Sequence, residues 1–147
     1  MIAVDDPGFA PLARFTADLL DARRQRFPAI VRAGRMTRAE ADRGILIAAV
    51  LAEIWSAAAD TRIPDPERIG RVTRREIVCD LLLARDAINR TLASHACAKQ
   101  PCDALTRYRD QLNTLLDWHC RFVDGPLLGV RATLQLRRLG ETQRHAA

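Results

Sequence analysis

Lysine and aromatic side chains are scarce in this 147-residue chain, and long apolar runs are missing. Lys99 is the only lysine among 23 basic residues, so the net charge of +5 comes from arginine. Aromatic residues make up only 5%, which argues against a surface that stacks the bases of single-stranded nucleic acid. The longest apolar stretch, residues 44–59, contains Glu53 and is shorter than the roughly 20 residues of a membrane-spanning helix. We therefore expect a buried core helix there and no membrane partner.

An export signal is also missing from the first residues. Asp5, Asp6 and Pro7 stand where a signal peptide needs a basic start followed by an apolar run. We therefore expect a cytoplasmic location, in which cysteines are thiols by default.

Short motifs typical of enzymes and metal sites are not found. The chain has no P-loop, no Gly-x-Gly-x-x-Gly, no His-Glu-x-x-His and no Cys-x-x-Cys. His119 falls at an apolar seam position, where a hydrogen-bonded core histidine is commoner than a catalytic base. Glu53 is expected to pair with an arginine, and Trp55 and Trp118 are interpreted as core residues. We expect no enzyme, no cofactor and no metal.

Strand signals are lacking, and helical periodicity runs through the chain. No segment alternates apolar and polar residues, and no Asn-Gly or Asp-Gly turn is present. Pro28 is expected to kink or end the first helix, and Gly34 is expected to close a short turn of helix over residues 28–33. The sequence predicts one all-α domain over residues 1–147, a bundle of four to five helices with a polar tail from about residue 140. The predicted helices cover residues 11–26, 38–59 and 74–96, a stretch from 101 to the stop at Gly125-Pro126, and residues 127–139, with a linker at 61–72.

The cysteine spacing favours a long antiparallel hairpin of the third and fourth helices. Cys79 and Cys97 are 18 residues apart, as are Cys102 and Cys120, so each pair lies on one face of its helix. In such a hairpin Cys97 faces Cys102, and Cys79 faces Cys120. These two pairings are the disulfides that mild oxidation is expected to form, whereas a Cys79–Cys97 link is not expected. Two cysteine pairs five turns apart cannot converge on one zinc ion.

Positive charge gathers in two clusters. Residues 23–38 contain six arginines and no acid, and residues 68–75 contain four arginines and no acid. Such clusters favour an anionic partner, although a charge run is more often a solvated face. The candidate nucleic-acid-binding residues are Arg23, Arg24, Arg26, Arg35, Arg38, Arg71, Arg74 and Arg75.

One motif, Gly-Arg-apolar-Thr-Arg, occurs in both clusters, at residues 34–40 and 70–76. Each threonine is followed three residues later by glutamate, which predicts a helix N-cap and a capping box. Each glycine is expected to allow a left-handed turn before its helix. The arginines oppose the helix dipole and are not explained by capping. Three interpretations of these arginines stay open: they bind an anion at the helix N-terminus, they bond to the protein's own acids, or they are solvated.

Residues 23–43 read RRQRFPAIVRAGRMTRAEADR. The order of a basic cluster, an aromatic-Pro pair, an apolar pair, Gly-basic-apolar-Thr and Glu-Ala-Asp-Arg resembles a segment of small phage and prophage proteins of proteobacteria. The resemblance covers about one-seventh of the chain and implies a mobile-element setting rather than an activity.

Two functional classes follow. The first is a non-enzymatic nucleic-acid-binding protein that contacts phosphates with its arginine clusters, mainly electrostatically and with low sequence specificity. The second is a protein-interaction module, either a phage-encoded adaptor or inhibitor of a host protein, or a helical protein that self-associates as a homo-oligomer. No helix-turn-helix or zinc finger selects between them.

Overall fold

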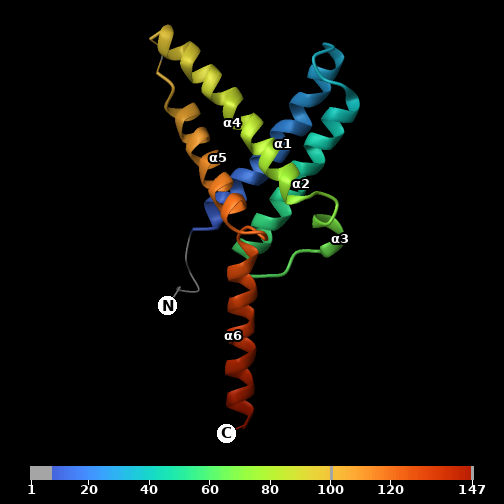
Figure 1. The fold of residues 1–147 in the computed structure, drawn as a ribbon, viewed down its shortest axis with the longest axis vertical. Helices are drawn as coiled ribbons and strands as arrows, with labels where there is room; N and C mark the ends of the chain where they lie inside the picture. Colours follow the sequence, from blue (N-terminus) through green and yellow to red (C-terminus); the bar gives the residue numbers. More distant parts are fainter. Residues whose placement is uncertain (1–7, 100, 147) are drawn as a thin grey trace.

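The computed structural model describes residues 8–99 and 101–146, and this part of the chain is all helical, as predicted (Figure 1). It contains six helices rather than four or five. Asp5, Asp6 and Pro7 at the start, and Gln100 in the turn expected between the third and fourth helices, lie outside the described residues. The helices are α1 (Ala10–Arg32), α2 (Arg38–Ala59), α3 (Pro66–Ile69), α4 (Arg74–Cys97), α5 (Asp103–Arg121) and α6 (Leu127–Ala146).

The turn that joins α1 to α2 has the local causes that the sequence indicates. Gly34 has a φ of +72°, a left-handed conformation that glycine adopts without strain. Thr37 accepts a hydrogen bond from the backbone N–H of Glu40, and the Glu40 carboxylate accepts one from the N–H of Thr37. The predicted capping box is thus confirmed, and α1 and α2 pack side by side beyond it.

Pro28 does not end α1, contrary to the expectation. The helix continues through it to Arg32, and the N–H of Ala33 still bonds to the carbonyl of Ala29. Packing against α2 holds the residue before the proline in place, since Phe27 lies so close to Gly44 that a Cβ there would meet the ring at 2.8 Å. Tertiary contact therefore outweighs the one hydrogen bond that proline removes.

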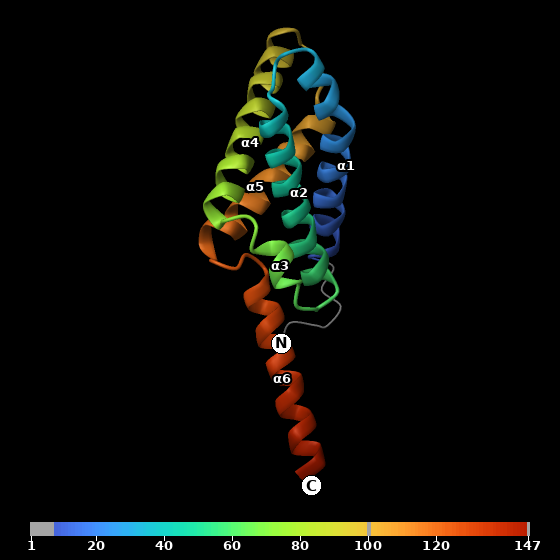
Figure 2. The same ribbon diagram turned by 90° about the vertical axis from the view of Figure 1, so that its right-hand side faces the viewer.

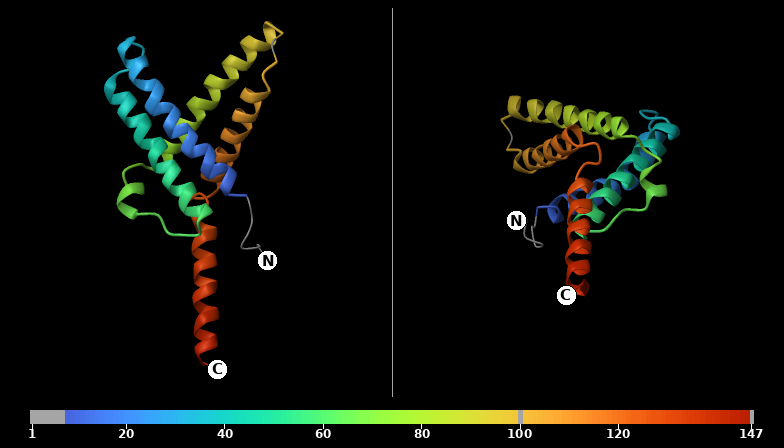
Figure 3. Two further views of the ribbon diagram at one scale, coloured as in Figure 1. Left: turned by 180° about the vertical axis from the view of Figure 1, so that it is seen from behind. Right: turned by 60° about the horizontal axis from the view of Figure 1, so that its bottom comes forward.

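Helices α4 and α5 also lie side by side, and the two helix pairs diverge (Figures 1 and 3). The pairs meet near the base, and the α1/α2 tip, at residues 33–37, points away from the ends of α4 and α5 at Cys97 and Asp103 (Figure 1). Ile77 and Leu81 near the start of α4 are buried, whereas Ile88 and Leu92, which continue the same apolar spacing, are only half-buried. The helices therefore do not run together as a single bundle along their whole lengths.

The hydrophobic core fills the base, where α1, α2, α4 and α5 meet. Its largest members are less than 2% exposed and include Leu51 and Trp55 from α2, Leu81 from α4, and Leu112 and Leu115 from α5. Burial of each such side chain contributes about 2 to 3 kcal/mol. Helix α2 contributes nine buried residues, which confirms its prediction as a buried core helix.

The linker between α2 and α4 folds into the one-turn helix α3, which lies beside the lower half of α2 (Figure 2). Gly70 after it has a φ of −68°, so the expected left-handed turn is wrong here. A Cβ on Gly70 would lie 2.9 Å from the carbonyl oxygen of Pro66, so this position requires glycine because of a close backbone approach. The second predicted capping box, Thr73 with Glu76, is confirmed at the start of α4.

Helix α6 leaves the body of the molecule and projects beyond it (Figures 1 and 2). Only Leu127 and Val130 of its residues are buried. Residues 140–146 are polar and helical, so α6 continues beyond its expected end at residue 139; no proline interrupts this segment. Within residues 8–99 and 101–146, no helix is both long and apolar enough to cross a membrane.

Candidate functional site

Arg23 is a structural residue and not part of an exposed site, which corrects its prediction as a nucleic-acid-binding residue. It is 8% exposed and makes a two-pronged ion pair with Asp80 of α4, at 2.7 and 2.9 Å. It also donates to the carbonyl of Gly44 at 2.7 Å and lies over the ring of Phe27. The sequence carried a signal for this, because Arg23 follows Leu19 by four residues on the core-facing side of α1.

Arg74 also has an internal role. Its Nε donates to the carbonyl oxygen of His119 at 2.6 Å, and its Nη2 donates to that of Cys120. These carbonyls lie in the last turn of α5, where no intrahelical partner is available. Arg74 therefore caps α5 with a positive charge at its negative end. Because the residue is still exposed, its role in binding phosphate stays a prediction.

His119 and Trp55 form a buried polar pair at the base. Trp55 Nε1 donates to His119 Nε2 at 3.1 Å, and His119 is 2% exposed. Burial, assisted by the nearby positive charge of Arg74, lowers the pKa of His119 to about 4. Gly125, with a φ of +55°, packs so closely that a Cβ would lie 2.8 Å from His119 Cε1. This histidine is neutral and enclosed, as expected for a core residue.

Six other arginines that the sequence selected are exposed: Arg24, Arg26, Arg35, Arg38, Arg71 and Arg75. Within the described part of the chain, no carboxylate lies within ion-pair distance of any of these six side chains. The alternative in which they bond to the protein's own acids is therefore excluded for these residues in that part.

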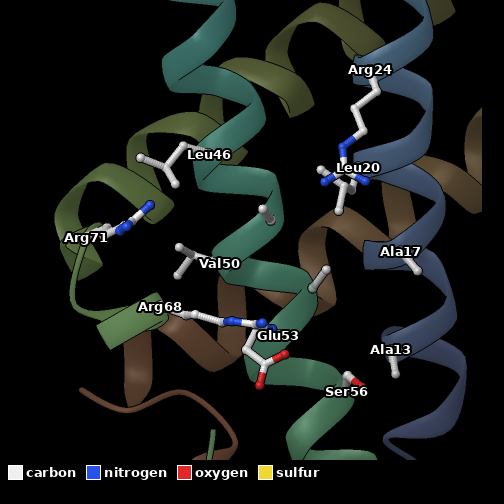
Figure 4. A pocket seen from close by; sticks show the side chains of 12 residues that line it. Ala13, Ala17, Leu20, Arg24, Leu46, Val50, Glu53, Ser56, Arg68 and Arg71 are labelled. Carbon is white, nitrogen blue, oxygen red and sulfur yellow. The ribbon is translucent and has the colours of Figure 1, made fainter. Parts of the chain in front are cut away.

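Arg24 and Arg71, one from each basic cluster, meet at a single groove together with Arg68. Figure 4 shows Arg24 coming from α1, while Arg68 and Arg71 come from the other side, beside α3. Arg68 was counted in the second cluster but was not selected as a site residue. We call this recess of about 620 Å³ the arginine groove. Its other lining residues are Ala13, Ala17, Leu20, Leu46, Ala49, Val50, Ala52, Glu53 and Ser56.

The only acid among the lining residues of the arginine groove is already paired. Glu53 accepts a hydrogen bond from Arg62 at 2.7 Å, which confirms the expected arginine partner. The remaining lining is apolar apart from Ser56 and the three arginines, and it contains no aromatic side chain. The groove thus combines a floor of small apolar side chains with a positively charged rim.

Arg43, which the sequence did not single out, holds the segment that carries Arg71. It pairs with Glu76 at the start of α4 and donates to the backbone carbonyl of Arg71 at 3.3 Å. The hydrogen bond from the Thr73 backbone, and then that from Arg43, lower the pKa of Glu76 to about 2. The second capping box therefore also positions one wall of the groove.

The cysteines do not form a shared site. Cys79, Cys97 and Cys120 are exposed thiols, and Cys102 Sγ lies within hydrogen-bonding distance of His95 Nδ1. The linkage of Cys97 to Cys102 and of Cys79 to Cys120 on oxidation stays a prediction. No group of three or more metal-ligating side chains occurs among the described residues.

No protein-family model, curated protein or solved structure matches this chain. The phage setting that the resemblance of residues 23–43 implies therefore stays a prediction.

Proposed function

We propose that the protein is a non-enzymatic interaction module that binds an acidic protein partner in the arginine groove. The observation that carries this proposal is the convergence of Arg24, Arg68 and Arg71, from segments more than 40 residues apart in sequence, on one apolar floor. Arg68 makes only a long contact of 3.7 Å to Asp65. A carboxylate-bearing partner would supply the missing counter-charges.

The apolar floor favours a protein over a nucleic acid. Phosphates are contacted by charged and hydrogen-bonding groups and make no use of a floor of alanine, leucine and valine. A base would need an aromatic face to stack on, and the groove has none. Small side chains such as Ala13, Ala17 and Ala49 let a helix approach closely, which is typical of helix-in-groove recognition.

Nucleic acid is the second candidate, and a separate observation favours it. Arg26, Arg35, Arg38 and Arg75 lie outside the arginine groove, are exposed, and have no ion-pair partner in the described residues. Phosphate contacts spread over such a surface would bind DNA or RNA with little sequence preference. We also propose that the module acts in the cytoplasm of a phage-infected or lysogenic cell, and that the α4/α5 pair is the expected antiparallel hairpin.

Paired variants separate the two candidates. The test variant R24A/R71A removes two positive charges from the arginine groove. The matched control R26A/R75A removes two positive charges outside the groove. Each is tested by fluorescence anisotropy against a glutamate-rich helical peptide and against duplex DNA over a range of salt concentrations. Selective loss of peptide binding in R24A/R71A supports the interaction module. Equal loss of DNA binding in both variants, with no peptide binding in the parent protein, supports the nucleic-acid candidate instead.

A further inference from the structure

A second recess of about 320 Å³ lies between α1 and α2, nearer to the tip at residues 33–37. Its rim carries Arg32 and Arg38, and Asp42 is its only acid. Its floor includes Phe27, Val31 and Ile45. Like the arginine groove, it has an apolar floor and a positively charged rim.

The two recesses lie end to end on the same side of the α1/α2 pair. On α1, the arginine groove is lined at positions 13, 17, 20 and 24, and the second recess continues at 27, 28, 31 and 32. Positions 13, 17, 20, 24, 28 and 31 are separated by steps of three and four residues, which keep them on one helical face, and 27 and 32 flank this face. On α2, positions 56, 53, 49, 45, 42 and 38 are related in the same way, and 46 flanks them. Neighbouring residues, Ile45 and Leu46, belong to the two adjoining recesses.

The combined trough has the dimensions of a helix-binding site. From Ala13 to Arg32 it follows α1 for 19 residue steps, which is about 28 Å at 1.5 Å per step. A partner helix of about 19 residues, or five turns, has the same length. It would lie against α1 and α2 and complete a three-helix arrangement on the side of the pair that the structure leaves open.

The charges select an acidic helix. Five arginines line the trough against two acids, and one of these acids, Glu53, is already paired with Arg62. A second copy of this chain would have to offer α6, whose exposed leucines stand at positions 128, 136 and 139. That helix has four arginines and one glutamate, so its charge would oppose the rim. Self-association through this trough is therefore disfavoured.

We propose that the whole trough is one site for a single acidic amphipathic helix of about five turns, with an apolar stripe on the floor and glutamate or aspartate toward both groups of arginines. Because this occupant rests on the proposed function, which needs only the arginine groove, the test must separate the two recesses. The new element is that Arg32 and Arg38 contact the same helix as Arg24 and Arg71.

Three synthetic peptides probe the site: a 19-residue alanine–leucine helix with glutamate on both flanks, an 11-residue version of it, and a 19-residue version with lysine for every glutamate. The charge reversals R24E/R71E and R32E/R38E act on one recess each. The matched control R90E/R107E reverses exposed arginines of α4 and α5. Circular dichroism checks folding, and glutamine variants at the same positions replace any reversal that unfolds the protein. Affinities are measured by anisotropy, and contacts are mapped by NMR shifts of α1 and α2.

We expect the long acidic peptide to bind most tightly and to lose roughly tenfold in affinity with either groove reversal but not with the control. We expect the short peptide to respond to one reversal only, and the lysine peptide not to bind. If R24E/R71E weakens the long peptide and R32E/R38E does not, the single-helix inference is wrong while the proposed function stands. If neither reversal changes the binding of any peptide, both are wrong.

Discussion

The stability of this protein should fall sharply in mild acid because of one buried histidine. His119 has a pKa of about 4 in the folded protein, against an ordinary value of 6.5. The unfolded chain therefore takes up a proton that the folded chain rejects, and stability rises with pH. The contribution is fully present above about pH 6.5 and is lost as the pH falls toward 4.

The size of the effect follows from the difference in pKa. A gap of about 2.5 pH units corresponds to a total loss of about 3 kcal/mol, of which about 2 kcal/mol is lost by pH 5. Glu40 and Glu76 have pKa values below the ordinary 4.5, so their hydrogen bonds begin to fail only at lower pH. The interval from pH 7 to pH 5 therefore isolates the histidine from these two carboxylates.

Urea unfolding followed by tryptophan fluorescence measures the effect at pH 7, 6 and 5. In the variant H119Q the side chain still offers Trp55 an acceptor but does not titrate, so its unfolding free energy should vary by about 2 kcal/mol less over this range. An NMR titration of His119 gives the folded-state pKa directly and does not depend on how well the variant folds. A midpoint near 6.5, or an equal pH dependence in parent and variant, would refute the reasoning.

Three further substitutions test the internal roles of the polar residues by chemical unfolding. R23A should destabilise the fold by about 3 kcal/mol, because it strands the half-buried Asp80 carboxylate, while R24A next to it should change stability by less than about 0.5 kcal/mol. T73A should cost about 1 kcal/mol through the lost N-cap. R74A should cost about 1 to 2 kcal/mol, because two carbonyls of α5 lose their donor; a loss no larger than in R75A would contradict the capping role.

Local features of this fold could be predicted from the sequence. The turn at Gly34 and the capping boxes at Thr37 and Thr73 depend only on residues within four positions of each other. The same is true of the all-helical class, which follows from periodicity. The arginine partner of Glu53 and the hydrogen-bonded core position of His119 were also predicted correctly, because a polar residue on an apolar face must find a partner.

Long-range pairing could not be predicted in the same way. Arg23 binds Asp80, 57 residues away, and Arg74 binds a carbonyl 45 residues away. The local pattern places Arg23 on the core-facing side of α1, but it does not identify the distant partner of either arginine. The divergence of the two helix pairs is likewise invisible in the apolar spacing of α4, which is regular through Leu92 although only its first half is buried.

In both arginine clusters, an arginine that contacts the rest of the fold is followed directly by an arginine that is exposed. A single step along a helix turns the side chain by about 100°, so Arg23 points into the core while Arg24 lines the arginine groove. A similar division follows the N-cap of α4, where both arginines are exposed but Arg74 donates hydrogen bonds to the end of α5. The number of arginines in a sequence cluster therefore exceeds the number that are free to bind a partner, because some of them stabilise the fold. The arginines that remain at the groove repel one another, and its one acid is already paired with Arg62, so an acidic ligand would relieve that repulsion.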